Sequence, residues 1–319
     1  MKKITFLLLM LPLISIAQAN KLFRKAMRVE DLNERIVLLS QVIDLEPKNF
    51  DAYFYRANAK NDMDDFHGAI MDYTKIIIYK PSAEIYYNRG NSKFNLEDLY
   101  GAKEDYLEAL KLEPEFIDAR YNLASVKYFL NDFEGSILDL TKIIELTPYQ
   151  PSVYMKRADC FLALEKPLYA LQDLTLSIIA APTAEAYYKR GLVYLSINYY
   201  RNAKNDFYNS ISIEPNNSSS FFYRGTTYLL LGKYKRALAD FSVPLKYYSL
   251  DYEALLGLAL TYYKMNDLEN AKINFEKAIR IIDPKKLNNI NIELFSETYW
   301  YKEQLFFFRD HFEGLSKLL

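Results

Sequence analysis

Hydrophobic positions along the chain follow a helical spacing and come in pairs of patterns separated by a short turn. In residues 187–215 the first pattern contains Tyr187, Gly191, Tyr194 and Ile197, at spacings of three and four. These spacings place the four residues on one face of a helix. The second pattern has five such positions: Tyr200, Ala203, Phe207, Ile211 and Ile213. Neither helix is long enough to be stable alone. The segment therefore predicts two helices that pack on each other and on a neighbouring pair.

The same pair of patterns recurs with a period of 33 or 34 residues. Prolines mark the end of each period, because proline lacks a backbone N–H and disfavours helix in the residue before it. These prolines are Pro47, Pro81, Pro114, Pro148, Pro182 and Pro215. A small residue recurs in each first helix: Ala57, Gly90, Ala124, Ala158, Gly191, Gly225 and Ala259. A large residue recurs in each second helix: Tyr73, Tyr106, Leu140, Leu174, Phe207, Phe241 and Phe275. Small residues let helices approach closely and large ones fill the space between periods, so the spacing predicts seven stacked helix pairs.

This pattern resembles the tetratricopeptide repeat. The residues that carry the resemblance in the fifth period are Tyr187, Arg190, Gly191, Tyr194, Ala203, Phe207 and Pro215. Tyr187 stands where the family usually has tryptophan, and Arg190 precedes the glycine where leucine is usual. The resemblance covers seven repeats, from about Phe50 to Pro284. It implies an all-α tetratricopeptide-repeat solenoid, a right-handed superhelix of antiparallel helix pairs.

The start of the chain departs from the repeat, as terminal repeats often do because one of their faces meets water. We predict a shortened repeat over residues 20–48, with helices at Asn20–Val29 and Leu32–Leu45, followed by seven repeats over residues 49–284. Pro244 falls inside the second helix of the sixth repeat and should kink it.

The tail also departs from the repeat. Residues 285–319 are predicted to form one or two helices that cap the last repeat. The aromatic residues of the tail are Trp300, Tyr301, Phe306, Phe307, Phe308 and Phe312. Three adjacent phenylalanines on one helix cannot all face a single seam of a core. A docking face, or an oligomer formed through residues 287–319, is therefore the alternative.

Residues 1–19 have the outline of a secretory signal peptide. Lys2 and Lys3 precede an apolar run, Ile4–Ile16, and the small residues Ala17–Ala19 suit a cleavage site. The 13-residue run is shorter than the roughly 20 residues that a membrane-spanning helix needs. No cysteine lies near the cleavage site, which argues against a lipid anchor. We therefore expect a periplasmic or secreted bacterial protein without a membrane span after cleavage.

Arginine and aspartate recur sixteen residues apart, with the arginine in the first helix and the aspartate in the second. The pairs are Arg56 and Asp72, Arg89 and Asp105, Arg157 and Asp173, Arg190 and Asp206, and Arg224 and Asp240. The third repeat has Leu123 in place of the arginine but keeps Asp139, and the seventh repeat has Leu258 and Asn274. A contact repeated in this way predicts a structural ladder between the two helices, because a ligand site would occur once.

The composition argues against catalysis and against nucleic acid as a partner. The net charge is −1, with 40 basic and 41 acidic residues, whereas nucleic-acid-binding domains carry a clear basic excess. Two histidines and a single cysteine, Cys160, leave little material for a metal site. Paired histidine spacings, nucleophile motifs and glycine-rich phosphate loops are missing from the sequence. We predict no enzymatic activity, no cofactor and no metal, and we expect Cys160 to be a buried, inert thiol.

The resemblance implies that the first helices line a concave face, which in this family holds an extended peptide or a partner helix. The residues that this implies for a peptide-binding groove are Phe54, Asn58, Tyr87, Asn88, Asn91, Tyr121, Asn122, Lys156, Tyr188, Lys189 and Phe222. Asparagine both donates and accepts hydrogen bonds and so suits a peptide backbone. Tyrosine offers contact area at low entropic cost. Many of the aromatic residues have an alternative role in packing one helix on another.

Two further features bear on the partner. The first half of this face is rich in asparagine and tyrosine, and the second half is more aliphatic. The family's carboxylate clamp requires lysine at the positions of Phe54 and Tyr87, so binding of chain ends in that manner is doubtful. Lys156 and Lys189 remain as candidates to meet an acidic partner.

The sequence thus predicts a scaffold in the cell envelope that binds a protein or peptide segment in its groove. Two alternatives stay open. One is a structural subunit of an envelope complex that assembles through the aromatic tail. The other is an accessory adaptor for an envelope enzyme.

Overall fold

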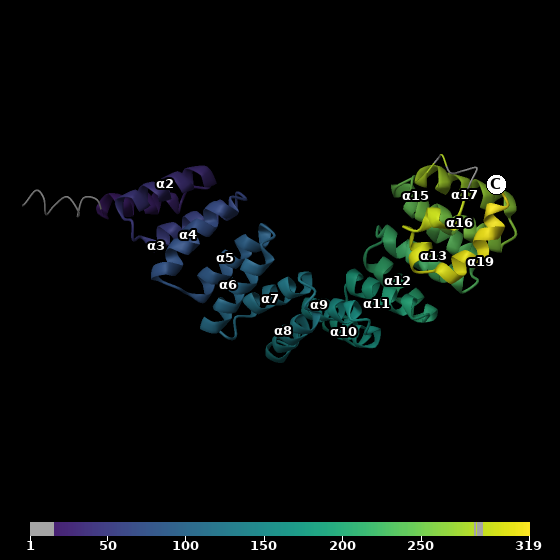
Figure 1. Cartoon of the computed structure of the whole chain (residues 1–319), viewed down its shortest axis with the longest axis horizontal. Coiled ribbons are helices and arrows are strands. Elements are labelled where there is room, and N and C mark those ends of the chain that lie inside the picture. The colour runs from purple at the N-terminus through teal and green to yellow at the C-terminus, as the bar shows by residue number, and fades with distance from the viewer. Residues whose placement is uncertain (1–15, 284, 286–289) are drawn as a thin grey trace, which may run out of the picture. The chain divides into compact units, whose positions relative to one another are not determined.

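The computed structural model describes residues 16–283, 285 and 290–319, and these residues form helices joined by short turns (Figure 1). No strand occurs in this part of the chain. Contacts between residues divide the chain into an N-terminal unit that ends at Pro148 and a C-terminal unit that begins at Tyr149. The all-α prediction is confirmed. None of the helices in the described ranges is long and apolar enough to cross a membrane.

The N-terminal unit contains the shortened repeat and repeats one to three. A helix over residues 16–26 precedes α2 (Leu32–Leu45). The helix pairs of the three repeats are α3 (Phe50–Asn61) with α4 (Phe66–Tyr79), α5 (Ala83–Asn95) with α6 (Leu99–Leu112), and α7 (Ile117–Phe129) with α8 (Phe133–Leu146).

The C-terminal unit contains repeats four to seven and the tail. Its helix pairs are α9 (Pro151–Ala163) with α10 (Pro167–Ala180), α11 (Ala184–Ser196) with α12 (Tyr200–Ile213), α13 (Ser218–Leu230) with α14 (Tyr234–Phe241) and α15 (Pro244–Tyr247), and α16 (Tyr252–Lys264) with α17 (Leu268–Ile282). The tail forms a 3-10 helix, η2 (Ile292–Phe295), and two helices, α18 (Tyr299–Lys302) and α19 (Leu305–Ser316). Within each unit, every helix contacts the next one along the chain from repeat to repeat.

Each hairpin turn contains one residue with a positive φ. These residues are Asp64, Glu97, Asn131, Glu165, Asn198, Gly232 and Asn266, with φ between 56° and 70°. In repeats one, two, three and seven the next residue is an aspartate that caps the second helix: Asp65, Asp98, Asp132 and Asp267. Each of these side chains accepts a hydrogen bond from a backbone N–H of the first turn, which fixes where the helix begins.

The small and large positions meet in the core of each repeat, as their spacing predicts. Ala203 and Phe207 in α12 are fully buried. A Cβ atom added to Gly191 would lie 2.8 Å from Cε1 of Phe207, which is closer than carbon atoms approach. Glycine therefore allows α11 and the Phe207 ring to pack directly against each other.

The structure differs from the prediction for the first helix. It was expected at Asn20–Val29, but the helix is already present at Ile16 and ends at Ala26. Met27 consequently lies in the following turn, 40% exposed, rather than on the buried face. Ala19 is fully buried in a cluster with Leu39 of α2. Most of the predicted signal peptide, residues 1–15, lies outside the described residues.

The prediction for Pro244 is confirmed. Helix α14 ends at Phe241, and Pro244 begins the short helix α15. Proline is favoured at the first position of a helix and disfavoured inside one, because it has no backbone N–H to donate. The second helix of repeat six is therefore split in two.

The tail packs on the last repeat. Phe295, Trp300, Phe308 and Leu315 are fully buried in one cluster with residues of α16 and α17. The three adjacent phenylalanines have different environments, as their spacing requires: Phe308 is buried, while Phe306 is 83% exposed. The packing of α18 and α19 on α16 brings the tail to the first-helix side of the C-terminal unit.

Candidate peptide-binding face

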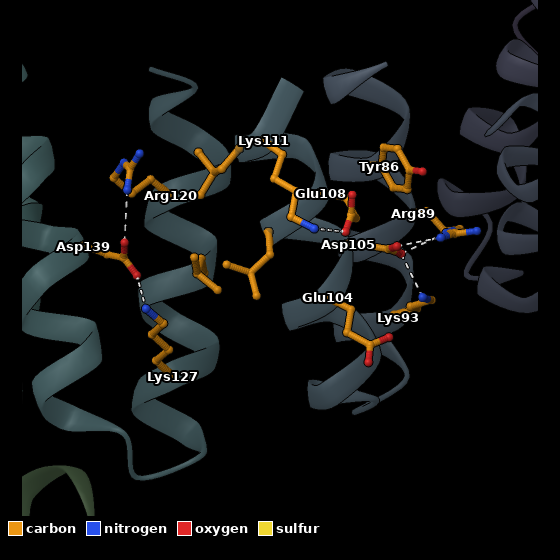
Figure 2. Close-up of a pocket in the computed structure, with 13 residues that line it drawn as sticks. Tyr86, Arg89, Lys93, Glu104, Asp105, Glu108, Lys111, Arg120, Lys127 and Asp139 are labelled. Carbon is orange, nitrogen blue, oxygen red and sulfur yellow. Dashed lines mark hydrogen bonds and ion pairs between the residues drawn. The ribbon is translucent and has the colours of Figure 1, made fainter. Parts of the chain in front are cut away.

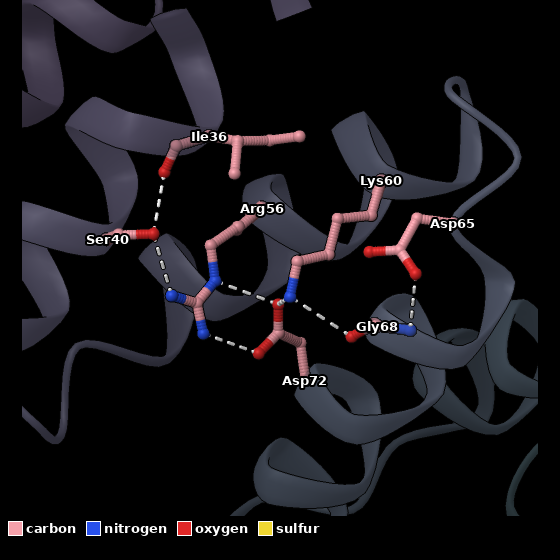
Figure 3. Close-up of polar contacts among 7 residues, drawn as sticks. All are labelled: Ile36, Ser40, Arg56, Lys60, Asp65, Gly68 and Asp72. Atoms are coloured by element: carbon pink, nitrogen blue, oxygen red, sulfur yellow. Dashed lines mark hydrogen bonds and ion pairs between the residues drawn. The ribbon is translucent and has the colours of Figure 1, made fainter. Parts of the chain in front are cut away.

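The predicted Arg–Asp ladder is present and joins the two helices of repeats one, two, four, five and six. In repeat one, Nε and Nη2 of Arg56 donate to the two carboxylate oxygens of Asp72, at 2.9 and 2.6 Å (Figure 3). Nη1 of Arg56 donates to Ser40 in α2, so this guanidinium links its own helix, α3, to both α2 and α4. The same two-bond contact occurs between Arg89 and Asp105, Arg157 and Asp173, Arg190 and Asp206, and Arg224 and Asp240. These charges are used inside the fold and are not available to a ligand.

The residue four positions after the ladder arginine differs between the two units, and its contacts were not predicted. In repeats one to three a lysine four residues after the arginine position also binds the aspartate: Lys60, Lys93 and Lys127. In repeats four to six the same position is aromatic, and the arginine lies over that ring: Phe161, Tyr194 and Tyr228. Among the described residues, Arg190 is therefore the sole cationic partner of Asp206 in α12, whereas Asp72 also binds Lys60, which would remain if Arg56 were removed.

Repeat three satisfies its aspartate in another way. Arg120, one turn before Leu123 in α7, donates to Asp139 at 3.2 Å, and Lys127 binds the same carboxylate at 2.6 Å (Figure 2). Repeats one, two, four, five and six place an aromatic residue at the position of Arg120, as with Tyr86 in repeat two. In this repeat the arginine lies one helical turn earlier than in the others. The sequence predicts that repeat three lacks the contact, but Arg120 provides a contact to Asp139 from its different position.

This exchange leaves a cleft of about 680 Å³ between α6 and α7, lined by Leu123 among others (Figure 2). The cleft is rich in charge, but all of its charged side chains except Glu104 form ion pairs with one another. The ion pairs are Arg89 and Lys93 with Asp105, Lys111 with Glu108, and Arg120 and Lys127 with Asp139. A charged ligand would have to compete with these contacts, so we regard the cleft as part of the ladder and not as the binding site.

The first helices of the N-terminal unit place the predicted asparagines side by side. Nδ2 of Asn122 in α7 donates to Oδ1 of Asn91 in α5 at 2.8 Å. Oγ of Ser92 in α5 donates to Asn61 in α3 at 2.9 Å. Each of these bonds joins residues 31 positions apart on the first helices of successive repeats, so the first helices of this unit form one continuous face.

Buried tyrosines fix the orientation of two of these asparagines. The Tyr73 hydroxyl accepts from Asn61 Nδ2 and donates to Oδ1 of Asn58. The Tyr106 hydroxyl donates in the same way to Oδ1 of Asn91 at 2.7 Å. Burial raises the pKa of both tyrosines, so their hydroxyls keep the protons that they donate. The amide oxygens of Asn58 and Asn91 are therefore occupied, and the hydrogen-bonding capacity left to these side chains is that of their N–H groups.

The remaining predicted residues of this unit divide between packing and exposure. The Phe54 ring lies 6.4 Å from that of Tyr73 in α4, and the Tyr87 ring lies 4.9 Å from that of Phe116 at the start of α7, so both pack between helices. Tyr121 is half-buried on α7. The side chain of Asn88 is half-buried, and the described part of the chain offers it no hydrogen-bond partner. Asn88 is thus the predicted residue with the most free hydrogen-bonding capacity.

In the C-terminal unit the predicted lysines are less available than the sequence suggests. Nζ of Lys189 in α11 binds both oxygens of Asp159 in α9, at 2.8 and 2.9 Å. Burial lowers the pKa of Lys156, and the nearby charge of Lys189 adds to this against the opposite effect of Asp159. An acidic partner would have to displace the Lys189–Asp159 contact, so the expected attraction is weakened.

The tail covers part of the first-helix face of the C-terminal unit, which the sequence did not predict. The Tyr299 ring packs edge-to-face on Phe222, at 5.5 Å, and on Tyr223, at 5.3 Å. Trp300 lies 6.0 Å from both Phe222 and Phe241. Phe222 is consequently buried beneath the docked tail. The only advance signal was the departure of the tail from the repeat, with the single tryptophan of the chain inside it.

Glu253 anchors the tail. Its Oε1 accepts from the backbone N–H of Tyr299 at 2.8 Å, and its carbonyl oxygen accepts from Nε1 of Trp300 at 3.1 Å. Its other carboxylate oxygen, Oε2, is buried without a hydrogen-bond partner in the described residues. Burial raises the pKa of Glu253 to about 7, against the smaller lowering effect of the Tyr299 N–H.

This pKa predicts a dependence of stability on pH. The folded chain holds the proton of Glu253 at pH values where the unfolded chain has lost it, so the stabilisation is present below about pH 4.5 and is lost as the pH rises through about 7. We expect Glu253 to account for a fall of about 2–3 kcal/mol in the free energy of unfolding across this window. Urea denaturation at both ends of the window should show this fall in the native chain and not in E253Q. An equal fall in the two proteins would contradict the assignment.

Two cavities lie on this face, on either side of Tyr299. One, of about 470 Å³, is mostly apolar and is lined by Leu162, Leu192 and Tyr223 together with Glu303 and Gln304 of the tail. The other, of about 260 Å³, lies nearer the first turn of α16. No group of three or more histidine, cysteine or acidic residues in the described ranges is placed to hold a metal ion. Cys160 is fully buried, as expected.

Comparisons with known proteins agree with this architecture. Residues 83–116, 184–217, 207–239 and 252–283 match family models described as tetratricopeptide repeat. A stretch of 112 residues, 34% of this chain, is 31% identical to tetratricopeptide repeat protein 13 of Homo sapiens. The match covers 13% of the length of that protein.

Solved structures show the same fold. A tetratricopeptide repeat protein from Parabacteroides merdae superposes with a TM-score of 0.56 at 18% identity, over 84% of this chain and 98% of the other. YrrB, described as a tetratricopeptide-repeat protein with an unusual peptide-binding site, gives a TM-score of 0.50 at 22% identity, over 57% of this chain and 95% of the other. Together with the stacked helix pairs, these matches show that the chain contains tetratricopeptide repeats and folds as an all-α solenoid built from them.

Proposed function

We propose that the protein is a non-enzymatic scaffold that holds an extended segment of a partner protein against its first helices. Tetratricopeptide-repeat folds are typically protein-binding scaffolds, and YrrB, with a similar fold, has a peptide-binding site by its own description. The observation that carries the proposal is the asparagine row of the N-terminal unit. Asn58 and Asn91 have their amide oxygens occupied by tyrosines and offer N–H groups, and Asn88 between them is unengaged.

The chemistry of this row suits a main chain. An extended peptide presents carbonyl oxygens at regular intervals, and a side-chain amide N–H is a suitable donor to them. Recognition of the backbone gives affinity without requiring one particular sequence, whereas neighbouring pockets give specificity. We therefore place the main contact of the partner on α3, α5 and α7.

A photo-crosslinking amino acid tests this assignment. Placed at position 88, on the asparagine row, it should capture the partner from an extract of the source cell. Placed at position 71 in α4, where Met71 is 73% exposed, it should capture little. Asn88→Ala should weaken binding of a captured and purified partner about three- to tenfold, the effect of one lost hydrogen bond. Equal capture from both positions, or capture from position 71 alone, would reject the proposed face.

We also propose that the protein acts in the bacterial cell envelope, on the basis of the signal-like residues 1–19. The expected product begins at Asn20, because cleavage after Ala19 satisfies the small-residue rule. The intact mass of the protein isolated from the envelope fraction tests this. A mass that includes residues 1–19, in protein found only in the cytoplasm, would contradict it.

A role as a structural subunit that assembles through its aromatic tail receives less support. Trp300, Phe295 and Phe308 are buried against their own chain, which leaves Phe306 as the exposed aromatic residue of the Phe306–Phe308 run. An adaptor role toward an envelope enzyme is compatible with the proposed face, because such an enzyme would be one kind of bound partner.

A further inference from the structure

The smaller of the two cavities beside Tyr299 has an aromatic wall. It has a volume of about 260 Å³ and lies among the starts of α13, α16 and α18, with Tyr188 from α11. Four aromatic residues line it: Tyr188, Phe222, Tyr223 and Tyr299. Their rings are in mutual contact, with centroids 5.8 Å apart for Tyr188 and Tyr223 and 5.3 Å apart for Tyr223 and Tyr299. Burial raises the pKa of these three tyrosines, so they stay neutral.

The charge of the cavity has one sign. Asp251 and Glu253 both line it, and none of the described residues that line it is basic. Asp251 caps α16 through a hydrogen bond from the backbone N–H of Ala254 at 3.0 Å, which offsets the partial positive charge of that helix end. The nearby base Lys302 binds Glu297 instead, at 2.6 Å. Above about pH 7, where Glu253 is ionised, the cavity therefore presents negative charge that forms no ion pair with a described residue.

Among the residues that line the cavity, Glu253 is unusual because one of its carboxylate oxygens is buried without a hydrogen-bond partner in the described residues. The hydrogen bond from Tyr299 to its Oε1 needs only a carbonyl-type acceptor, which glutamine would supply equally well. The carboxylate nevertheless leaves Oε2 buried and without a partner. A buried polar atom left in this state is destabilising and calls for a physical explanation.

We propose that this cavity binds the cationic end of a lysine or arginine side chain of the partner segment, with the aromatic rings around the cation and Glu253 as its counter-ion. The inference rests on and extends the proposed function, because it assigns a side-chain preference to the first helices of the C-terminal unit. Aromatic rings attract cations through the negative potential of their faces. A charge-assisted hydrogen bond to Oε2 would satisfy the orphaned oxygen. The cavity has the size of a single side chain and is smaller than a site for a drug-sized ligand.

The test uses a small cation in place of the unidentified partner. Trp300 is the only tryptophan, and its Nε1 donates to the carbonyl oxygen of Glu253. Its indole N–H therefore gives one resolved NMR signal beside the cavity. Addition of n-butylammonium to the full chain, at constant ionic strength, should shift this signal in a saturable manner. Sodium ions and neutral n-butanol should not.

Two matched variants distinguish the cavity from the general surface. E253Q keeps the acceptor for Tyr299 and removes the charge, so it should weaken n-butylammonium binding by about tenfold or more. E303Q removes an exposed carboxylate beside the other cavity and should leave binding within about twofold. The indole signal of each variant without ligand should match the native position, which shows that the tail remains docked.

The pH dependence gives a second readout. Binding requires ionised Glu253, whose pKa is raised to about 7 by burial, so affinity should rise about tenfold from about pH 6 to about pH 8. The other groups that face Glu253 are Asp251, Tyr252, Tyr223, Tyr299 and Lys302. The pKa of each of these tyrosines and of Lys302 is raised, so all four stay in one protonation state across this interval. The pH dependence should be flat in E253Q.

The proposal is overturned if n-butylammonium produces no saturable shift, or if E253Q and E303Q bind it equally. These outcomes are independent of the proposed function. A partner captured from position 88 without any binding of n-butylammonium would reject the cavity and keep the scaffold. Binding of n-butylammonium in a chain that captures no partner would keep the cavity and reject the scaffold.

Discussion

Replacement of Trp300 by alanine should destabilise the C-terminal unit by about 3–5 kcal/mol, the usual cost of truncating a large buried aromatic residue. Trp300 is fully buried. Its ring contacts Phe222 and Phe241, and its Nε1 donates to the carbonyl oxygen of Glu253. The variant would leave both a cavity and an unpaired carbonyl. Urea denaturation followed by circular dichroism measures the loss.

Phe306→Ala is the matched control, because Phe306 lies in the same tail but is 83% exposed. Its removal should change the free energy of unfolding by less than about 0.5 kcal/mol. In Trp300→Ala, amide hydrogen exchange should also quicken in α13 and α16, since the covering tail is loosened. A Trp300→Ala chain as stable as the Phe306→Ala chain would show that the tail does not hold the last repeats together.

Replacement of Arg190 by leucine should cost about 3–5 kcal/mol, because it leaves the carboxylate of Asp206 buried without a positive partner. Asp206 is 3% exposed, and both of its oxygens accept hydrogen bonds from this arginine. Nη1 of Arg190 also donates to Thr175 in the preceding repeat, so the loss should extend to the contact between repeats four and five. The midpoint of thermal or urea denaturation provides the measurement.

The chain offers two controls for this prediction. Arg56→Leu should cost less than Arg190→Leu, because Lys60 remains bound to Asp72 at 2.8 Å. The double change of Arg190 to leucine and Asp206 to asparagine copies the pair found in repeat seven, Leu258 and Asn274. It should recover most of the stability, since no buried charge is left unpaired. Equal losses in the single and double variants would mean that the packing of the guanidinium, and not its charge, is what matters.

The polar residues of the chain fall into two groups: those that form the Arg–Asp ladder and those on the proposed binding face. Arginines and aspartates in repeats one to six join the helices of the fold, so we propose the asparagines of the N-terminal unit and the carboxylates near Tyr299 as the groups that contact a partner. The two units therefore offer different chemistry on their first helices. One has a row of neutral amide donors, and the other has aromatic cavities with a negative charge.

The candidate residues were predicted only in part. The period places Asn58, Asn91 and Asn122 on first helices, and the structure brings Asn91 and Asn122 into direct contact. The sequence did not predict that Tyr73 and Tyr106 occupy the oxygens of Asn58 and Asn91. It also did not predict that Asp159 holds Lys189. Such pairings depend on which rotamers meet across two helices, and spacing along the chain does not specify this.

The repeat architecture and the five regular Arg–Asp contacts followed from the sequence alone. A residue at a given position of the repeat meets the same neighbours in every repeat, so one local rule, applied seven times, describes most of the chain. Only the tertiary structure decided the contacts that occur once. Arg120 forms the contact to Asp139 that Leu123 cannot form. In the tail, Tyr299 and Trp300 pack on Phe222, and both donate hydrogen bonds to Glu253. No periodicity marks a contact between residues 46 positions apart, such as Tyr299 and Glu253. It forms because the last repeat has an exposed apolar face and the tail carries the aromatic residues that bury it.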